Sequence, residues 1–71
     1  MNKKDFKRDF KKGDICLIRC RNGTEFFSTD YFFVGRQLNL VVNAIVKEPE
    51  GRVIKRLVIG SIDIGDVNEV V

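Results

Sequence analysis

The apolar side chains of this chain follow two different spacings. Near its start, Phe6 and Phe10 are four residues apart, which places both rings on one side of a helix. Asn2 or Asp5 can cap such a helix, and lysines are favourable in its last turn. The pattern therefore predicts a short helix that runs to about Lys12 and packs its two phenylalanines into a core.

After Gly13, which is placed to end the helix, the spacing changes to two. Alternation of this kind predicts strands. In the first strand, Cys16, Ile18 and Cys20 lie on one face. An Asn-Gly dipeptide at residues 22–23 then predicts a hairpin turn.

The next strand is rich in aromatic residues, and its alternation breaks partway along. Phe26 and Ser28 share a face, whereas Tyr31 and Phe33 have the opposite parity. One extra residue near positions 29–30 would return both pairs to the same face. We therefore predict a bulge there that bends the strand sharply.

Tight turns separate the remaining apolar segments, and residues 60–66 are expected to form an irregular or 3₁₀ turn. The predicted strands are 14–21, 24–34, 38–47, 52–59 and 68–71. A short α-helix followed by five such strands predicts a mostly β fold, a strongly bent antiparallel small barrel of the SH3-like kind. The 71 residues form one domain, with a helix over 1–12 and a barrel over 14–71.

Two of these strands are apolar on both faces, over residues 38–46 and 53–59. A barrel of this size needs only one apolar face for its core. The surplus predicts a second buried surface, most simply strand pairing with another copy of the chain. The alternative is that the helix and the turns cover the surplus.

The net charge of +3 comes from the start of the chain, because its first twelve residues carry six basic and two acidic side chains. A basic arm on a near-neutral body suits contacts with phosphates. The alternative is a helix that lysines merely keep soluble. The candidate phosphate-contacting residues are Lys3, Lys4, Lys7 and Arg8.

Other chemistry has few candidates. The chain has no histidine and two cysteines, Cys16 and Cys20, which would lie about 13 Å apart on a strand, too far for a disulfide. We expect both to be buried and reduced, which fits a cytoplasmic protein, and no apolar run suggests a membrane partner. Asp63 and Asp66 are expected to cap a turn, so we predict neither an enzyme nor a cofactor.

Asn39 interrupts an apolar run, and a side-chain amide there needs partners or a ligand. The run Leu-Asn-Leu-Val-Val-Asn-Ala at 38–44, together with the Asn-Gly turn, resembles the first motif of the Sm and Sm-like family, which includes bacterial Hfq. Val-Ile-Gly at 58–60 resembles the shorter second motif. The resemblance covers residues 13–71 and implies an Sm-like barrel.

The resemblance also implies a homo-oligomeric ring, in which the fourth strand of one subunit pairs with the fifth strand of the next. It implies a partner as well, single-stranded and often uridine-rich RNA at the ring pore. The RNA-binding residues that it implies are Asn39, Gln37, Arg36 and Gly60.

Three positions depart from the family pattern: Gly35 stands in place of an aspartate, Gln37 in place of a stacking residue and Ile59 in place of an arginine. Stacking is worth about 1–3 kcal/mol per base, so these departures predict weaker uridine binding. They leave open a second hypothesis, a protein-interaction scaffold that keeps the ring but has lost RNA recognition.

Overall fold

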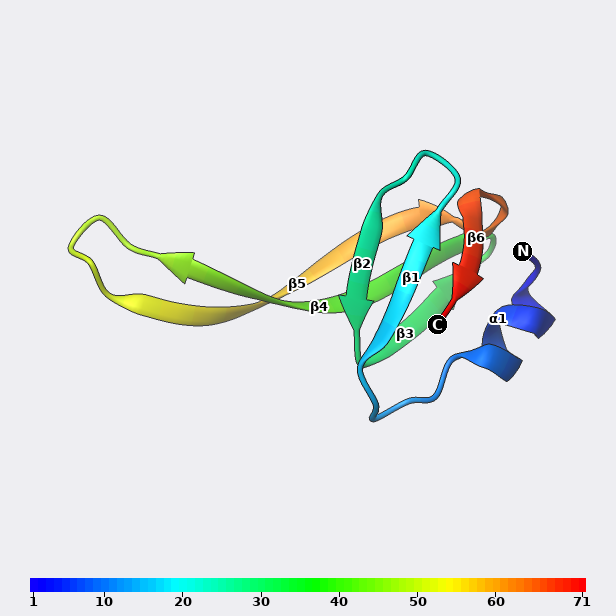
Figure 1. Ribbon diagram of the computed structural model, residues 1–71, viewed down its shortest axis with the longest axis horizontal. Helices are drawn as coiled ribbons and strands as arrows, with labels where there is room; N and C mark the ends of the chain where they lie inside the picture. The colour runs from blue at the N-terminus through cyan, green and yellow to red at the C-terminus, as the bar shows by residue number, and fades with distance from the viewer.

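The computed structural model describes the backbone of residues 1–71 and the side chains of residues 1–42 and 47–71. The chain is mostly β, with one short N-terminal helix and six strands in two antiparallel sheets (Figure 1). The elements are α1 (Lys3–Asp9), β1 (Cys16–Cys20), β2 (Glu25–Ser28), β3 (Asp30–Val34), β4 (Gln37–Lys47), β5 (Val53–Asp63), the 3₁₀ turn η1 (Ile64–Asp66) and β6 (Val67–Val70). The strand orders are β2-β1-β6 and β3-β4-β5.

The helix α1 closes one end of the core. The Asn2 side chain accepts a hydrogen bond from the backbone N–H of Asp5, which confirms the predicted cap. The rings of Phe6 and Phe10 stack on each other, and both meet the ring of Tyr31 edge to face. The predicted end at Lys12 was wrong, because Phe10 already has extended backbone and turns its ring into this aromatic cluster.

The core lies between the two sheets. Cys16, Ile18 and Cys20 point inward from β1, as the alternation predicted. Both cysteines are free, and burial raises the pKa of the Cys20 thiol, with Asp66 adding to the effect. The core cluster consists of Phe6, Phe10, Cys16, Ile18, Leu38, Leu40, Ile64 and Val67.

The predicted bend is present, as a break at Thr29 between β2 and β3, which belong to different sheets, rather than as a bulge within one strand. The Ser28 side chain is buried there, and its hydroxyl lies 2.7 Å from the carbonyl oxygens of both Asp30 and Val41. Ser28 therefore ties the bend to β4. On either side of the bend, Phe26 and Tyr31 pack against the same core, which is the consequence that the change of parity predicted.

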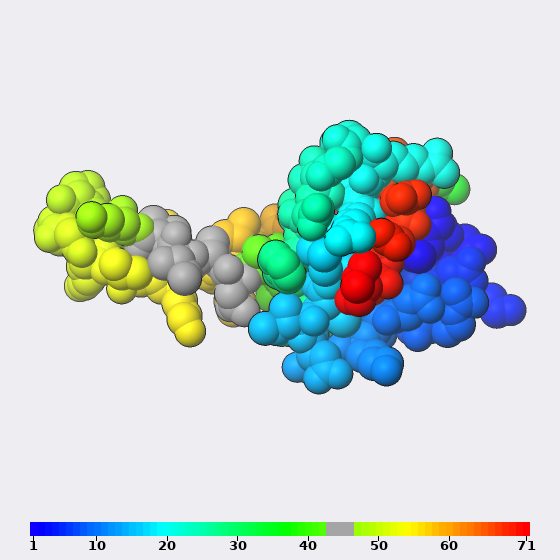
Figure 2. Space-filling view, viewed as in Figure 1, coloured from blue at the N-terminus to red at the C-terminus, as the bar shows by residue number. Residues whose placement is uncertain are grey.

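The hairpin of β4 and β5 is the longest element pair, with eleven residues in each strand. The expected irregular segment at 60–66 was wrong over residues 60–63, because β5 continues there in register with residues 37–40. Only η1 remains as the predicted turn. Beyond the last pairing of β4 with β3, at Val41, the hairpin projects from the compact body, and we call residues 41–59 the arm (Figures 1 and 2).

The two sheets do not close on each other in the strand pairings of the described backbone, where β5 and β6 are edge strands. The predicted five strands are six, since the bend divides the second one. The longest extents of the molecule are 44 × 25 × 21 Å. No helix in the described chain is long and apolar enough to cross a membrane.

Candidate nucleic-acid interface

The outer face of the sheet β3-β4-β5 carries an aromatic ring beside an amide. Phe32 on β3 is directly opposite Asn39 on β4, and Asn39 is opposite Ser61 on β5. The core residues Leu38 and Leu40 flank Asn39 in the chain, so Asn39 has the opposite parity and lies on the outer face. Phe32 is 45% exposed, which leaves its ring open to a ligand.

Asn39 is only 8% exposed, and its amide is already bonded within the chain. Its oxygen accepts a hydrogen bond from the Ser61 hydroxyl, and its nitrogen donates to the Gln37 carbonyl at 3.4 Å. An asparagine amide has two N–H donors, and the second donates to no group of the backbone or of the described side chains. The bond from Ser61 to the amide oxygen links β5 to β4, whereas the bond to Gln37 stays within β4.

Arg36 lies in the turn between β3 and β4 and forms an ion pair with Asp63. The closest distance, between Nη2 and Oδ1, is 3.1 Å, and the Asp63 carboxylate also accepts the Gly65 N–H at 2.8 Å. Both bonds lower the pKa of Asp63 below its ordinary 3.8, Arg36 having the larger effect. This confirms that Asp63 caps the 3₁₀ turn.

The Arg36–Asp63 pair is exposed, since 72% of the Arg36 side chain is open to solvent. Pairs of this kind are worth about 0–1 kcal/mol, so a phosphate can compete with Asp63 for the guanidinium. Arg36 therefore remains available as an anion contact at the rim of the sheet.

The other two implied RNA contacts take different positions. Gln37 is exposed at the first position of β4, in the same series of alternate residues as Asn39. Gly60 is opposite Leu40 rather than Asn39, one position along β5 from the row that contains Phe32. The residue of β5 that lies opposite Asn39 is Ser61, which the sequence analysis did not name.

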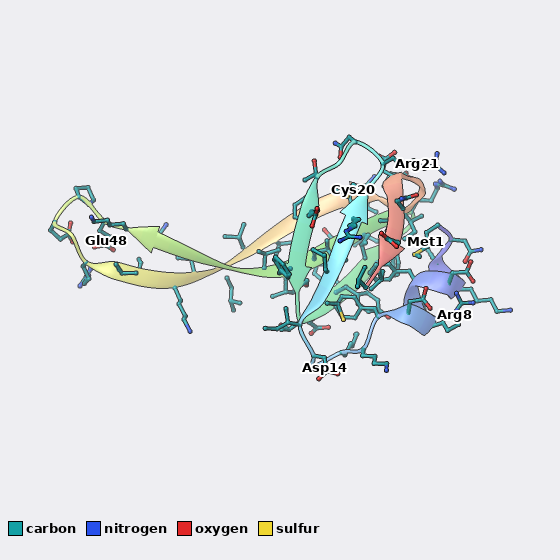
Figure 3. All side chains as sticks on the ribbon, viewed as in Figure 1. Met1, Arg8, Asp14, Cys20, Arg21 and Glu48 are labelled. Atoms are coloured by element: carbon teal, nitrogen blue, oxygen red, sulfur yellow. The ribbon has the colours of Figure 1, made fainter. Side chains whose placement is uncertain are left out.

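The basic residues of α1 divide into two sets. The ammonium groups of Lys3 and Lys7 lie 5.2 and 5.7 Å from the centre of the Phe33 ring. Arg8, at the opposite end of the molecule from Glu48 (Figure 3), forms ion pairs with Asp5 and Asp9. The charge of Arg8 is thus partly neutralised, whereas Lys3 and Lys7 remain together on an aromatic ring. Lys4 is exposed.

The predicted residues therefore occupy two sides of one sheet. Phe33 faces the core and its lysines lie on that side, whereas Asn39 and Phe32 lie on the other. The β3–β4 turn, with Arg36, connects the two sides beside α1 (Figure 1). The sequence analysis did not assign Phe32 to RNA binding, although the bend that turns Tyr31 inward also turns Phe32 outward.

Together these features define a small β-rich protein with an exposed aromatic ring beside a buried amide, next to a basic rim. Comparison of the chain with protein-family models finds no match, and comparisons with curated proteins and with solved structures find none either.

Proposed function

We propose that this chain is a subunit of an Sm-like homo-oligomeric ring that binds single-stranded, uridine-rich RNA and has no catalytic activity. The observation that carries the proposal is the exposed ring of Phe32 directly opposite Asn39. A planar ring and an adjacent amide are the two groups that readers of unpaired bases use. Phe32 supplies the stacking surface that Gln37 lacks.

The strand order supports the Sm-like part of the proposal. If β2 and β3 are counted as one strand bent at Thr29, the order becomes β6-β1-β2/β3-β4-β5, a five-stranded antiparallel arrangement with β6 and β5 at its two edges. An edge strand presents unpaired backbone groups to another chain. Pairing of β5 with β6 of the next copy uses both edges, and repetition of this heterologous contact produces a ring when its rotation closes.

The site can hold one base and the adjoining phosphates. A base stacked on Phe32 brings its edge to the remaining N–H of Asn39, which donates to a carbonyl oxygen of uracil. Arg36 exchanges Asp63 for a phosphate, and Lys3 and Lys7 provide two further positive charges beyond the turn. The RNA strand would thus cross the β3–β4 turn from the outer face of the sheet to the helix.

A second candidate is a protein-interaction scaffold with the same ring. It is favoured by the bonds that already engage the site, since Ser61 bonds to Asn39 and Asp63 neutralises Arg36. In this case the exposed Phe32 is part of a protein-binding surface. The two candidates differ in whether the assembled protein binds RNA.

Fluorescence anisotropy with labelled oligo(U) tests the proposal. Phe32→Leu keeps an apolar side chain without a π face, so the loss of stacking by about 1–3 kcal/mol weakens binding roughly 5- to 150-fold. Phe32→Trp keeps the π face and retains binding. If Phe32→Leu binds as tightly as the wild type, stacking on Phe32 is wrong.

A salt titration separates phosphate contacts from base contacts. Lys3→Gln and Lys7→Gln each reduce the salt dependence by about one counterion, and they weaken binding to all homopolymers alike. Arg52→Gln is the matched control, because Arg52 lies in the loop of the arm, paired with Glu48. An assembled protein that binds no RNA homopolymer at low salt would contradict the RNA function and favour the scaffold.

A further inference from the structure

The outer face of the sheet β3-β4-β5 continues past the row of Phe32 and Asn39 onto the arm. Asn39 is opposite Ser61 in that row, and β4 and β5 stay paired in the same register to their far ends. Because alternate residues of a strand lie on one face, steps of two lead outward from this row to Lys47 on β4 and to Lys55 on β5. The face that carries the candidate base-binding row therefore also carries two lysines on the arm.

These two lysines are neighbours without a counterion. Lys47 is opposite Val53, so Lys55 is its diagonal neighbour on the same face, and such neighbours lie about 7–8 Å apart. Both lysines are exposed, and neither forms an ion pair with a side chain of residues 1–42 or 47–71. Residues 43–46 contain no acidic group. Two like charges at this spacing repel each other, so an anion that lies between them is attracted by both.

The acidic side chains of the same face, and those in the loop of the arm, already have basic partners. The loop lies at the far end of the arm, where Glu48 is labelled in Figure 3. The ion pairs are Lys12–Asp30, Arg36–Asp63, Arg52–Glu48 and Arg52–Glu50. Among the described side chains, the uncompensated charges of this face are therefore those of Lys47 and Lys55, and both are positive.

We infer that Lys47 and Lys55 form a second phosphate-binding site for single-stranded RNA, so that a strand stacked on Phe32 continues outward along the arm. The inference rests on the proposed RNA-binding function and adds a contact at the end of the sheet that lies away from α1. Lys55 precedes Ser61 by six residues, which is about 20 Å along a strand. The two lysines therefore bind phosphates several nucleotides away from the base on Phe32.

The backbone of the arm favours RNA over a lipid surface as the ligand. β4 pairs with β3 only as far as Val41, so beyond that residue both strands of the arm have an open edge of backbone polar groups. Open edges are not tolerated in the hydrocarbon of a membrane. A flexible single strand, in contrast, can follow the face of a ribbon as it twists. Pairing of β5 with the next copy in the proposed ring uses its edge and leaves this face free.

Continuity with the base-binding row favours RNA over an acidic protein. The row of Phe32 and Asn39 and the two lysines lie on one uninterrupted face of paired strands. An RNA strand brings both groups that this face can bind, a base for the aromatic ring and a phosphate at every nucleotide for the lysines. An acidic peptide would use the lysines only.

The salt dependence of oligo(U) binding to the assembled protein tests the inference. The probe is a labelled oligo(U) of about 12 nucleotides, within the site sizes of about 4–16 nucleotides of small barrels that bind single strands. Lys47→Gln and Lys55→Gln each lower the slope of log K against log salt by about 0.7, and the double variant K47Q/K55Q lowers it by about 1.4. Lys47→Arg and Lys55→Arg keep the charge and retain the slope of the wild type.

Arg56→Gln is the matched control. Arg56 is the next residue after Lys55 and is also exposed without an ion pair to a described side chain, but its position in β5 places it on the opposite face of the arm. The variant removes the same charge from the same part of the molecule and should retain the slope of the wild type. Because all three positions are exposed, circular dichroism should be unchanged in every variant.

Three results would overturn the inference. The first is a double variant that keeps the wild-type slope, and the second is an Arg56→Gln variant that loses as much as Lys55→Gln. The third is a double variant that loses binding to polyglutamate but not to oligo(U), which would assign the lysines to an acidic protein. A protein whose oligo(U) binding depends on Phe32 but not on Lys47 and Lys55 refutes the arm site alone. An assembled protein that binds no oligo(U) refutes the proposed function together with this inference.

Discussion

The body and the arm use similar apolar residues in opposite ways. In β1 the inward residues Cys16, Ile18 and Cys20 are at most 7% exposed, because α1 and the second sheet cover them. In β5 Leu57 and Ile59 are 72% and 58% exposed. The body buries its apolar face within one subunit, whereas the arm cannot. The comparison teaches that subunit stability resides in the body, and the exposed apolar side chains of the arm agree with the assembly that we propose.

The largest loss of stability is expected when an aromatic ring is removed from the core of the body. Phe6 is fully buried and contacts the rings of Phe10, Tyr31 and Phe33. We expect Phe6→Ala to lower the free energy of unfolding by about 3–5 kcal/mol, which is most of the stability of so small a domain. Urea denaturation followed by circular dichroism measures the loss.

Val34→Ala is the matched control for Phe6→Ala, because Val34 is exposed on the outer face of β3. Its effect on the free energy of unfolding should stay within about 0.5 kcal/mol. Equal losses in the two variants would show that α1 does not close the core.

A smaller effect is expected at the bend that joins the two sheets. Ser28→Ala removes the hydroxyl that bonds to the carbonyls of Asp30 and Val41, and it leaves buried acceptors without that donor. The free energy of unfolding should fall by about 1–3 kcal/mol. Ser28→Thr, which keeps the hydroxyl, should lose less in the same urea titration. If both variants lose the same amount, packing rather than hydrogen bonding holds the bend.

The body could be predicted from the sequence in some detail. The parity change between Phe26 and Tyr31 predicted the bend, and the spacing of Phe6 and Phe10 predicted how the helix packs, because period and parity report directly on burial. The sequence analysis also found surplus apolar surface on the strands at 38–46 and 53–59. It expected another copy of the chain, or else the helix and the turns, to cover that surface. The helix covers the aromatic cluster instead, and the arm stays exposed.

The candidate site was predicted only in part. Arg36, Gln37 and Asn39 do cluster, since they lie within four residues at one turn. The contacts of Asn39 with Ser61 and of Arg36 with Asp63 depend on the register of β5, which extends past Gly60. Gly60 interrupts the apolar pattern, so the sequence suggested that the strand ends there. The pattern of apolar residues also does not fix the register between two strands that are far apart in sequence.

For an exposed residue of the arm, the effect of a substitution on stability should depend on whether the subunits are assembled. For Leu57→Ala we expect a change of less than about 0.5 kcal/mol in the unfolding of dissociated subunits at high dilution. At high concentration the wild type should have a raised melting temperature that rises with concentration, and the variant should lose most of this dependence. Calorimetry over a hundredfold range of concentration measures both. A concentration-independent wild type would contradict an assembly role for the arm.

The smallest expected effect lies where β5 returns to the body, at Asp63. Arg36 lowers the pKa of this carboxyl below 3.8, and so does the Gly65 N–H. A pKa lowered by folding stabilises the native state above pH 3.8, and this contribution is lost as the pH falls through the folded pKa.

Asp63→Asn keeps the acceptor for Gly65 but removes the charge. The variant should therefore be slightly less stable than the wild type at pH 7, and the difference should shrink as the pH falls below 3.8 and through the folded pKa. Arg36→Gln, which removes the ion-pair partner but leaves the Gly65 N–H, should lose the larger part of this acid dependence in urea titrations at each pH. A difference that persists unchanged at pH values well below 3.8 would mean that the charge of Asp63 does not account for it.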